Sequence, residues 1–285
     1  TVDPASLPVS YEVMSGEAIN AILLARLQAV PVIPTLFSQR TRQIFSYGQE
    51  QGQNRRVFSK LGDCQTEHEG YLLPFGVGEY VLGEQYAPLQ ATIDFFGVSP
   101  RHGVANSFVN QSMAAESAFT TAAVLDPVWT DPGHCQAGET PLTCEYRLVR
   151  PAVAVIMFGS VDVRVHTIEQ FAYHLRRIVE QSIDRGIIPL LSTFPNSGEA
   201  DYDKTLQFNA LVLDVAAEQQ VPVMNLWRAL QPLPNLGLAE DNYHLSYKGE
   251  RFISFADGDQ DRWGFSLRNL VVLQTLDELR RQVLR

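Results

Sequence analysis

The chain has 285 residues, with 22 Lys and Arg against 32 Asp and Glu, and a formal net charge of −10. Apolar residues make up 45% of the sequence, which is enough for a full core and argues against intrinsic disorder. The acidic balance disfavours nucleic acid or an anionic membrane as a partner, because binding phosphate requires clustered Lys and Arg. No apolar run reaches the roughly 18 residues that a membrane-spanning helix needs.

The first 55 residues differ in pattern from the rest and predict a helical extension. Helical patterns cover residues 16–28 and 38–51. Because a segment of this length buries little surface alone, we expect it to pack on a main domain formed by residues 56–285. No basic-then-apolar signal segment is visible. The chain starts at Thr1 and not at Met, which is compatible with a leader removed from an exported protein.

After about residue 55, apolar strand-like runs alternate with amphipathic helical patterns, which is typical of a parallel sheet covered on both faces. The expected strands, in chain order, are residues 56–61, 91–96, 152–158, 187–193 and 221–226. The third run is entirely apolar, so we expect it to be buried on both sides. The sequence therefore predicts an α/β fold, a three-layer α/β/α sandwich around a mainly parallel five-stranded sheet.

Helices are expected between and after the later strands. The first begins at Thr167, which has Gln170 three residues on in a capping-box pattern, and it stops at Gly186. A second helix covers residues 203–219. The last 20 residues, 266–285, carry apolar side chains at roughly helical spacing and predict a final helix.

Three cysteines are informative by their placement. Cys135 and Cys144 lie nine positions apart in a loop rich in Gly, Pro and Thr. This spacing predicts a disulfide-closed loop, worth about 2–3 kcal/mol, although two unpaired surface thiols are the alternative. A disulfide favours a secreted or cell-surface protein. Cys64 is left unpaired, and no Cys-x-x-Cys pair or His/Cys cluster suggests a metal site.

In a doubly wound sheet, ligands bind beyond the carboxyl ends of the strands. Three polar clusters fall at such positions: residues 60–66, 158–162 and 241–246. They offer a nucleophile, Cys64, a base, His244, and an orienting carboxylate, Asp241. One helical turn can place Asp241 and His244 on one side, so that the imidazole contacts the carboxylate and accepts the thiol proton. A cysteine beside such a base can exist as the nucleophilic thiolate.

The three clusters resemble motif blocks of the SGNH/GDSL hydrolase family, in the family's order and spacing. The first block, Gly-Asp-Ser, is matched by Gly62-Asp63-Cys64. The third block, Gly-x-Asn-Asp, is matched by Gly159-Ser160-Val161-Asp162. The fifth block, Asp-x-x-His, is matched by Asp241-Asn242-Tyr243-His244. The resemblance covers roughly residues 55–285.

The resemblance implies covalent cleavage of an ester or thioester: Cys64 attacks the carbonyl, His244 moves the proton and Asp241 holds the imidazole. This reaction requires no metal or organic cofactor. The implied substrate is a small acyl ester or an acylated glycan or lipid. The other block residues are candidates for the oxyanion hole or pocket: Gly62, Asp63, Gly159, Val161 and Asp162. For Asp162, a structural hydrogen-bond acceptor is the alternative.

Two departures from the family pattern affect the chemistry. Cys64 stands where the family has serine, and Val161 stands where an asparagine side chain donates to the oxyanion. Losing one such donor typically costs about 10²–10³ in turnover. The backbone amide of Cys64 remains as a donor. The backbone amide of the family's second block has three candidate positions: Gly97, Gly103 and the Ser117-Ala118 segment.

Two functions follow as alternatives. The first is an exported hydrolase with an altered nucleophile and an impaired oxyanion hole. The second is a catalytically degenerate domain that serves as a cell-surface structural, assembly or glycan-binding protein, for which self-assembly is open. Cys64 is then a small buried residue and His244 a loop cap, while His68 is a surface residue or a substrate contact. Several aromatic residues either line a sugar- or lipid-facing cleft or pack in the core: Trp129, Tyr146, Trp227, Tyr243 and Trp263.

Overall fold

The computed structural model describes residues 17–198 and 200–285, without the side chains of residues 17 and 18. Its helices are α1 Glu17–Ala29, α2 Gln39–Glu50, α3 Cys64–Glu67, α4 Leu73–Val77, α5 Gly83–Tyr86, α6 Gln90–Phe95, α7 Pro141–Val149, α8 Asp162–Val165, α9 Ile168–Ile183, α10 Tyr202–Gln219, α11 Leu226–Leu230 and α12 Gly264–Gln282. Its strands are β1 Asn54–Gly62, β2 Tyr80–Val81, β3 Pro151–Met157, β4 Ile188–Ser192, β5 Val223–Met224 and β6 Ile253–Ser254. Thr1 and Gly16, the expected start of the first helix, lie outside the described residues.

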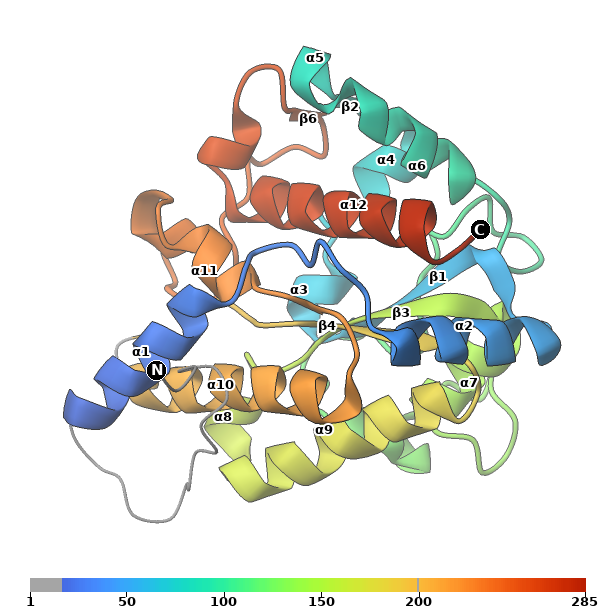
Figure 1. Cartoon of the computed structure of the whole chain (residues 1–285), viewed down its shortest axis with the longest axis horizontal. Coiled ribbons are helices and arrows are strands. Elements are labelled where there is room, and N and C mark those ends of the chain that lie inside the picture. Colours follow the sequence, from blue (N-terminus) through green and yellow to red (C-terminus); the bar gives the residue numbers. More distant parts are fainter. Residues whose placement is uncertain (1–16, 199) are drawn as a thin grey trace.

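The main sheet is parallel, with the strand order β1-β3-β4-β5. The entirely apolar strand β3 lies inside the sheet, and all of its residues are buried, as its composition predicts. Figure 1 shows α12 on one side of the sheet and α9 and α10 on the other. The three-layer α/β/α architecture is therefore confirmed. A separate pair of short parallel strands, β2 and β6, lies outside this sheet.

The predicted strand at residues 91–96 is wrong, because this segment forms helix α6. Its buried side chains belong to Leu89, Thr92, Ile93 and Phe96. This spacing of three and four residues is that of a helix face, whereas a half-buried strand would alternate. The main sheet consequently has four strands among the described residues, and not five.

The other predicted elements are found, with shifted ends. Helix α9 begins with the expected capping box: the Thr167 hydroxyl accepts from the Gln170 amide at 3.3 Å, and the Gln170 side chain accepts from the Thr167 amide at 2.9 Å. The helix ends at Ile183, three residues before Gly186, which has a φ of 67°. Strand β5 contains only Val223 and Met224, so it is shorter than expected.

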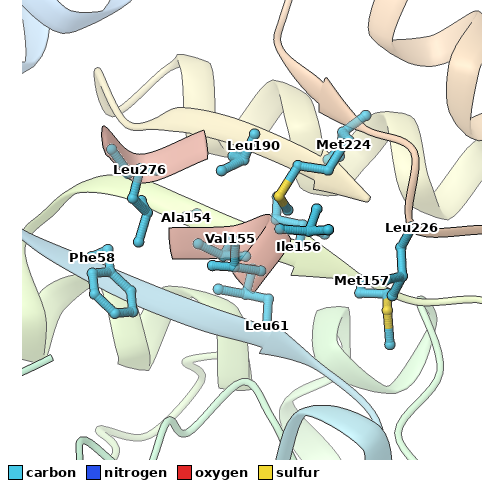
Figure 2. Packing of buried hydrophobic residues seen from close by; sticks show 14 of the residues in the cluster. Phe58, Leu61, Ala154, Val155, Ile156, Met157, Leu190, Met224, Leu226 and Leu276 are labelled. Atoms are coloured by element: carbon cyan, nitrogen blue, oxygen red, sulfur yellow. The ribbon is translucent and has the colours of Figure 1, made fainter. Parts of the chain in front are cut away.

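The core is formed where both helical layers meet the sheet. Figure 2 shows labelled side chains from all four strands and from α12 in one cluster, among them Phe58 of β1, Val155 of β3, Leu190 of β4 and Leu276 of α12. Each of these four side chains is at most 1% exposed. Truncating such a side chain to alanine typically costs about 2–5 kcal/mol, so the core holds the strand ends in fixed positions.

The N-terminal helices pack directly on the sheet domain. Leu23 and Leu27 of α1 are buried in a second cluster that includes Trp227 of α11. The Asn225 side-chain amide donates to the carbonyl oxygens of Leu27 and Val30, at 2.6 and 3.0 Å. These contacts agree with an extension packed on the main domain, and the division at residue 55 stays a prediction.

Cys135 and Cys144 are joined by a disulfide, with their Cα atoms 5.3 Å apart, so the predicted pairing is confirmed. The bond ties the loop before α7 to the helix itself. Cys64 is the remaining cysteine of the three in the sequence and is free. Among the helices within residues 17–198 and 200–285, none is long and apolar enough to cross a membrane.

Candidate active site

Cys64 lies immediately after β1, at the carboxyl edge of the sheet. Strand β1 ends at Gly62, and Asp63 caps the short helix α3 by accepting a hydrogen bond from the Gln65 amide at 3.0 Å. Cys64 is the first residue of α3 and is partly exposed. The local geometry therefore presents the thiol at the strand end where an α/β sheet binds its ligands.

A buried glutamine links α3 to the loop that carries the candidate base. The Gln65 side chain donates to the Tyr243 carbonyl at 2.9 Å and accepts from the Leu245 amide at 3.0 Å. Arg268 of α12, 2% exposed, donates in turn to the carbonyl of Gln65 and to the hydroxyl of Thr66. This arrangement, which we call the Gln65 clamp, fixes the loop of residues 241–246 beside Cys64.

Asp241 and His244 form the expected pair within this loop. Asp241 Oδ2 lies 2.6 Å from His244 Nδ1, while Asp241 Oδ1 accepts from the amides of Tyr243 and His244, both at 2.9 Å. Although burial alone would raise it, these hydrogen bonds hold the pKa of Asp241 below its ordinary value. Because Nδ1 is committed to the carboxylate, Nε2 is the nitrogen left to exchange a proton.

The environment of the Cys64 thiol does not favour a thiolate at rest. Burial, followed by the neighbouring Asp63 carboxylate, raises the pKa of Cys64 to about 11. A hydrogen bond from the Tyr243 hydroxyl and two backbone amides oppose this rise only in part. Within the described residues, the thiol contacts Tyr243 and makes no hydrogen bond to His244. Near neutral pH, Cys64 is therefore a protonated thiol.

The two acidic residues of the candidate pocket have different roles. Asp63 is fully buried, and burial raises its pKa to about 7, with a further contribution from Asp162. Asp162 accepts from the amide and hydroxyl of Thr121, at 2.9 and 2.6 Å, and contacts His166 Nδ1 at 3.0 Å. Of the two readings of Asp162, these contacts favour the structural acceptor, because they hold the loop before α7 against the end of β3.

Gly159 and Val161 occupy the turn after β3. Gly159 has a φ of 133°, and a Cβ there would lie 2.1 Å from the Phe194 ring, so only glycine fits. Val161 is partly exposed and directly precedes α8. Its side chain carries no hydrogen-bond donor, unlike the asparagine that the family pattern has at this position.

The loop before α7 lies against the end of β1. The Gly62 amide donates to the Ala114 carbonyl at 3.1 Å, and the Glu116 amide donates to the Gly62 carbonyl at 3.4 Å. Two residues later, Ala118 has a φ of 65°, in the left-handed region that favours glycine. A glycine-like backbone therefore occurs here without a glycine in the sequence.

This geometry separates the three candidate positions for the second-block amide. Gly97 lies two residues after the end of α6. The carbonyls of Asp94 and Phe95 in that helix accept from Arg56, at the start of β1 and away from Cys64. Of the three expected positions, the Ser117-Ala118 segment is the one that adjoins residues bonded to Gly62. The sequence did not single out this segment over the two glycines, because its left-handed position is occupied by alanine.

The aromatic residues divide between core and surface. Tyr146 and Trp227 are buried. Tyr243 is half-buried, and the Arg164 guanidinium lies 4.0 Å from its ring centroid. Trp129, in contrast, is 56% exposed. Sequence reasoning did not find Gln65, Arg164 or Arg268. A charged residue within the apolar pattern of the last helix was the one available signal, at Arg268.

Among solved structures, the chain aligns with the psychrotrophic esterase EstA from Pseudoalteromonas sp. at 14% identity and a TM-score of 0.49, covering 80% of this chain and 100% of the esterase. It aligns with a GDSL-like lipase from Bacteroides thetaiotaomicron at 12% identity and a TM-score of 0.47, covering 84% of this chain and 98% of the lipase. It aligns with the lipase/acylhydrolase from Enterococcus faecalis at 17% identity and a TM-score of 0.45, covering 79% of this chain and 96% of that chain. No curated protein sequence matches.

The family comparison covers the later motif blocks. Residues 98–252, more than half of the chain, match the GDSL-like lipase/acylhydrolase family. The matched segment includes the blocks at 159–162 and 241–244, and the block Gly62-Asp63-Cys64 precedes it. The chain belongs to the GDSL-like lipase/acylhydrolase family.

Proposed function

We propose that the protein is an exported acyl-ester hydrolase that uses Cys64 as its nucleophile, His244 as its general base and Asp241 as the residue that orients the base. The observation that carries the proposal is the Gln65 clamp, which ties the Asp241–His244 pair to the helix that begins with Cys64. Family membership supports ester hydrolysis in general. The disulfide between Cys135 and Cys144 supports export, because such bonds are rare in the cytosol.

The raised pKa of Cys64 determines how the reaction would proceed. Because the thiol is protonated at rest, His244 Nε2 takes its proton as sulfur attacks the ester carbonyl. The carbon–sulfur bond forms, the bond to the alkoxide breaks, and the imidazolium returns the proton to the departing alkoxide oxygen. Water, deprotonated by His244, then cleaves the thioester, which releases the acid and restores the thiol.

Two backbone amides are available for the oxyanion in this proposal. The first belongs to Cys64, and the second to Ala118, whose left-handed backbone adjoins the segment bonded to Gly62. Val161 adds no side-chain donor. Since one missing donor typically costs about 10²–10³ in turnover, we expect a slow enzyme.

A specific observation favours the second function, a degenerate domain with a binding or assembly role at the cell surface. The Cys64 thiol contacts the Tyr243 hydroxyl, and its pKa is raised and not lowered. An activated cysteine nucleophile usually has a lowered pKa. In this alternative, Cys64, Tyr243 and His244 only stabilise the edge of the sheet.

Hydrolysis of p-nitrophenyl acetate by matched variants tests the proposal. Cys64→Ala should abolish hydrolysis, and His244→Ala should lower kcat/KM by about 10²–10⁴. His134→Ala is the control, because His134 Nδ1 lies 2.7 Å from Asp131 Oδ2, three residues away, with exposure similar to that of the His244 pair. His134→Ala should leave the rate unchanged. If wild type and Cys64→Ala hydrolyse the ester equally fast, the degenerate alternative stands.

A further inference from the structure

A cavity of about 620 Å³ is lined by the end of helix α3, starting at Thr66, two residues after Cys64. One wall is formed by Glu67 and His68, at the end of the helix that Cys64 begins, and another by Ala115 and Glu116, next to the partners of Gly62. The volume falls within the range of about 300–1,000 Å³ that is usual for small-molecule sites. We call this space the α3 cavity. Cys64 does not line the cavity, but a molecule bound there would lie against the helix that Cys64 begins.

The walls of the α3 cavity combine apolar side chains, such as Leu73, Val109 and Met113, with several carboxylates. Glu67, Glu69 and Glu116 line it, together with Gln111 and Arg101. An acyl chain bound there would remove these charged groups from water, which is costly without hydrogen bonds in return. The four carboxylates of the lining, Glu67, Glu69, Glu116 and Asp131, outnumber its two cations, Lys60 and Arg101. They therefore disfavour phosphate or carboxylate ligands by charge repulsion. Hydroxyl groups, in contrast, donate to carboxylates and accept from amides and guanidinium groups.

His68 lines the same cavity and carries a defined hydrogen-bond donor. Its Nδ1 accepts from the Gly70 amide at 2.9 Å, so the proton of the neutral ring is on Nε2. Burial lowers the pKa of His68, and the nearby His244 lowers it further, which keeps the ring neutral. A neutral Nε2–H donor suits an uncharged oxygen acceptor.

The rim of the α3 cavity carries an exposed aromatic ring. Trp129 is 56% exposed and lines the cavity, and Phe119 supports it edge to face with ring centroids 6.2 Å apart. A large aromatic surface beside hydrogen-bonding groups can pack against the C–H face of a sugar ring while polar side chains bind its hydroxyl groups. This combination selects a carbohydrate over a lipid.

We propose that the α3 cavity binds an uncharged saccharide, so that acylated saccharides are the ester substrates of the site. Trp129 packs on the sugar ring, and His68, Gln111 and the carboxylates bind its hydroxyl groups. The choice of substrate class rests on the proposed hydrolase function, whereas saccharide binding by the cavity does not.

Calorimetric titration of the full chain with xylotetraose, cellotetraose and tetra-N-acetylchitotetraose tests the proposal. At least one tetrasaccharide should bind, and Trp129→Ala should weaken that binding about tenfold, as expected for a lost aromatic contact. Gln111→Ala, on the cavity wall, should weaken it several-fold. Val128→Ala is the matched control, because Val128 is 76% exposed beside Trp129 but does not line the cavity. It should leave the affinity unchanged.

Three results would overturn the proposal: no binding of any tetrasaccharide to wild type, equal binding by Trp129→Ala, or tighter binding of dodecanoate than of the saccharides. Binding and hydrolysis can fail separately. Cys64→Ala should still bind the saccharide, since the cavity does not depend on the thiol. If the protein binds the saccharide but shows no ester hydrolysis that Cys64→Ala abolishes, the binding-site proposal holds and the hydrolase proposal fails.

Discussion

The ionisation of the Cys64 thiol gives a direct test of how the site is built. Burial first, and the Asp63 carboxylate second, raise the pKa of Cys64 to about 11 from an ordinary 9.0. Asp63→Asn keeps the shape of the side chain and the oxygen that accepts from the Gln65 amide, but removes the charge. The pKa of Cys64 should then fall, while remaining above 9.0 because the burial persists.

The expected size of the effect follows from two opposing factors. At pH 7, a thiol with a pKa of about 11 is ionised about 100-fold less than one at 9.0. Its thiolate is, in return, about 6–10-fold more nucleophilic, because nucleophilicity rises with pKa. Cys64 should therefore react with iodoacetamide about tenfold more slowly than an unperturbed thiol.

The assay benefits from the cysteine content of the chain. Cys135 and Cys144 are bonded to each other, so alkylation of the unreduced protein reports on Cys64 alone. The rate should increase up to a pH near 11 in wild type and level off at lower pH in Asp63→Asn. A plateau below pH 9 in wild type, or identical profiles for both proteins, would refute the electrostatic reasoning.

Three further predictions concern stability and turnover. The pKa of Asp63 in the fold is about 7, above its ordinary 3.8, because the buried carboxyl is more stable protonated. The stability that this protonated group contributes is therefore fully present below pH 4 and is lost as the pH rises to 7. Between pH 4 and 7, the free energy of unfolding of Asp63→Asn from denaturant titrations should therefore rise relative to that of wild type, by up to about 4 kcal/mol. Equal pH dependence of the two free energies would contradict this. Val161→Asn should raise kcat on aryl esters by about 10–10³ with little change in KM, and an unchanged kcat would mean that the oxyanion lies elsewhere. Replacing Cys135 and Cys144 together by serine should lower the free energy of unfolding by about 2–3 kcal/mol in urea titrations, and an unaltered midpoint would show that the loop is held by other contacts.

Local patterns in the sequence predicted local structure well. The apolar run of β3, the capping box at Thr167 and the short loop between Cys135 and Cys144 each depend on neighbouring residues, and each is found in the fold. Residues 91–96 were misread because a short apolar run fits either a strand or a helix face. Burial of Ile93 and Phe96 in the core favours the helix over the strand.

The parts of the site that sequence reasoning missed depend on distant contacts. Gln65 bonds Tyr243 and Leu245, about 180 positions later in the chain. No local pattern marks such a residue. The same holds for the Cys64 pKa, which depends on burial and on the charge of Asp63. Ala118 adopts a backbone conformation that its residue type does not predict.

Detection of an acyl-enzyme on Cys64 tests the central claim most directly. Wild-type protein is mixed with p-nitrophenyl acetate, quenched in acid within the first turnovers and digested for mass spectrometry. We expect one added acetyl group on the peptide that contains Cys64, removable by hydroxylamine, and formed much more slowly in His244→Ala than in the His134→Ala control. Ester hydrolysis without acetylated Cys64, or equal acetylation rates in the two histidine variants, would contradict a mechanism in which His244 activates Cys64.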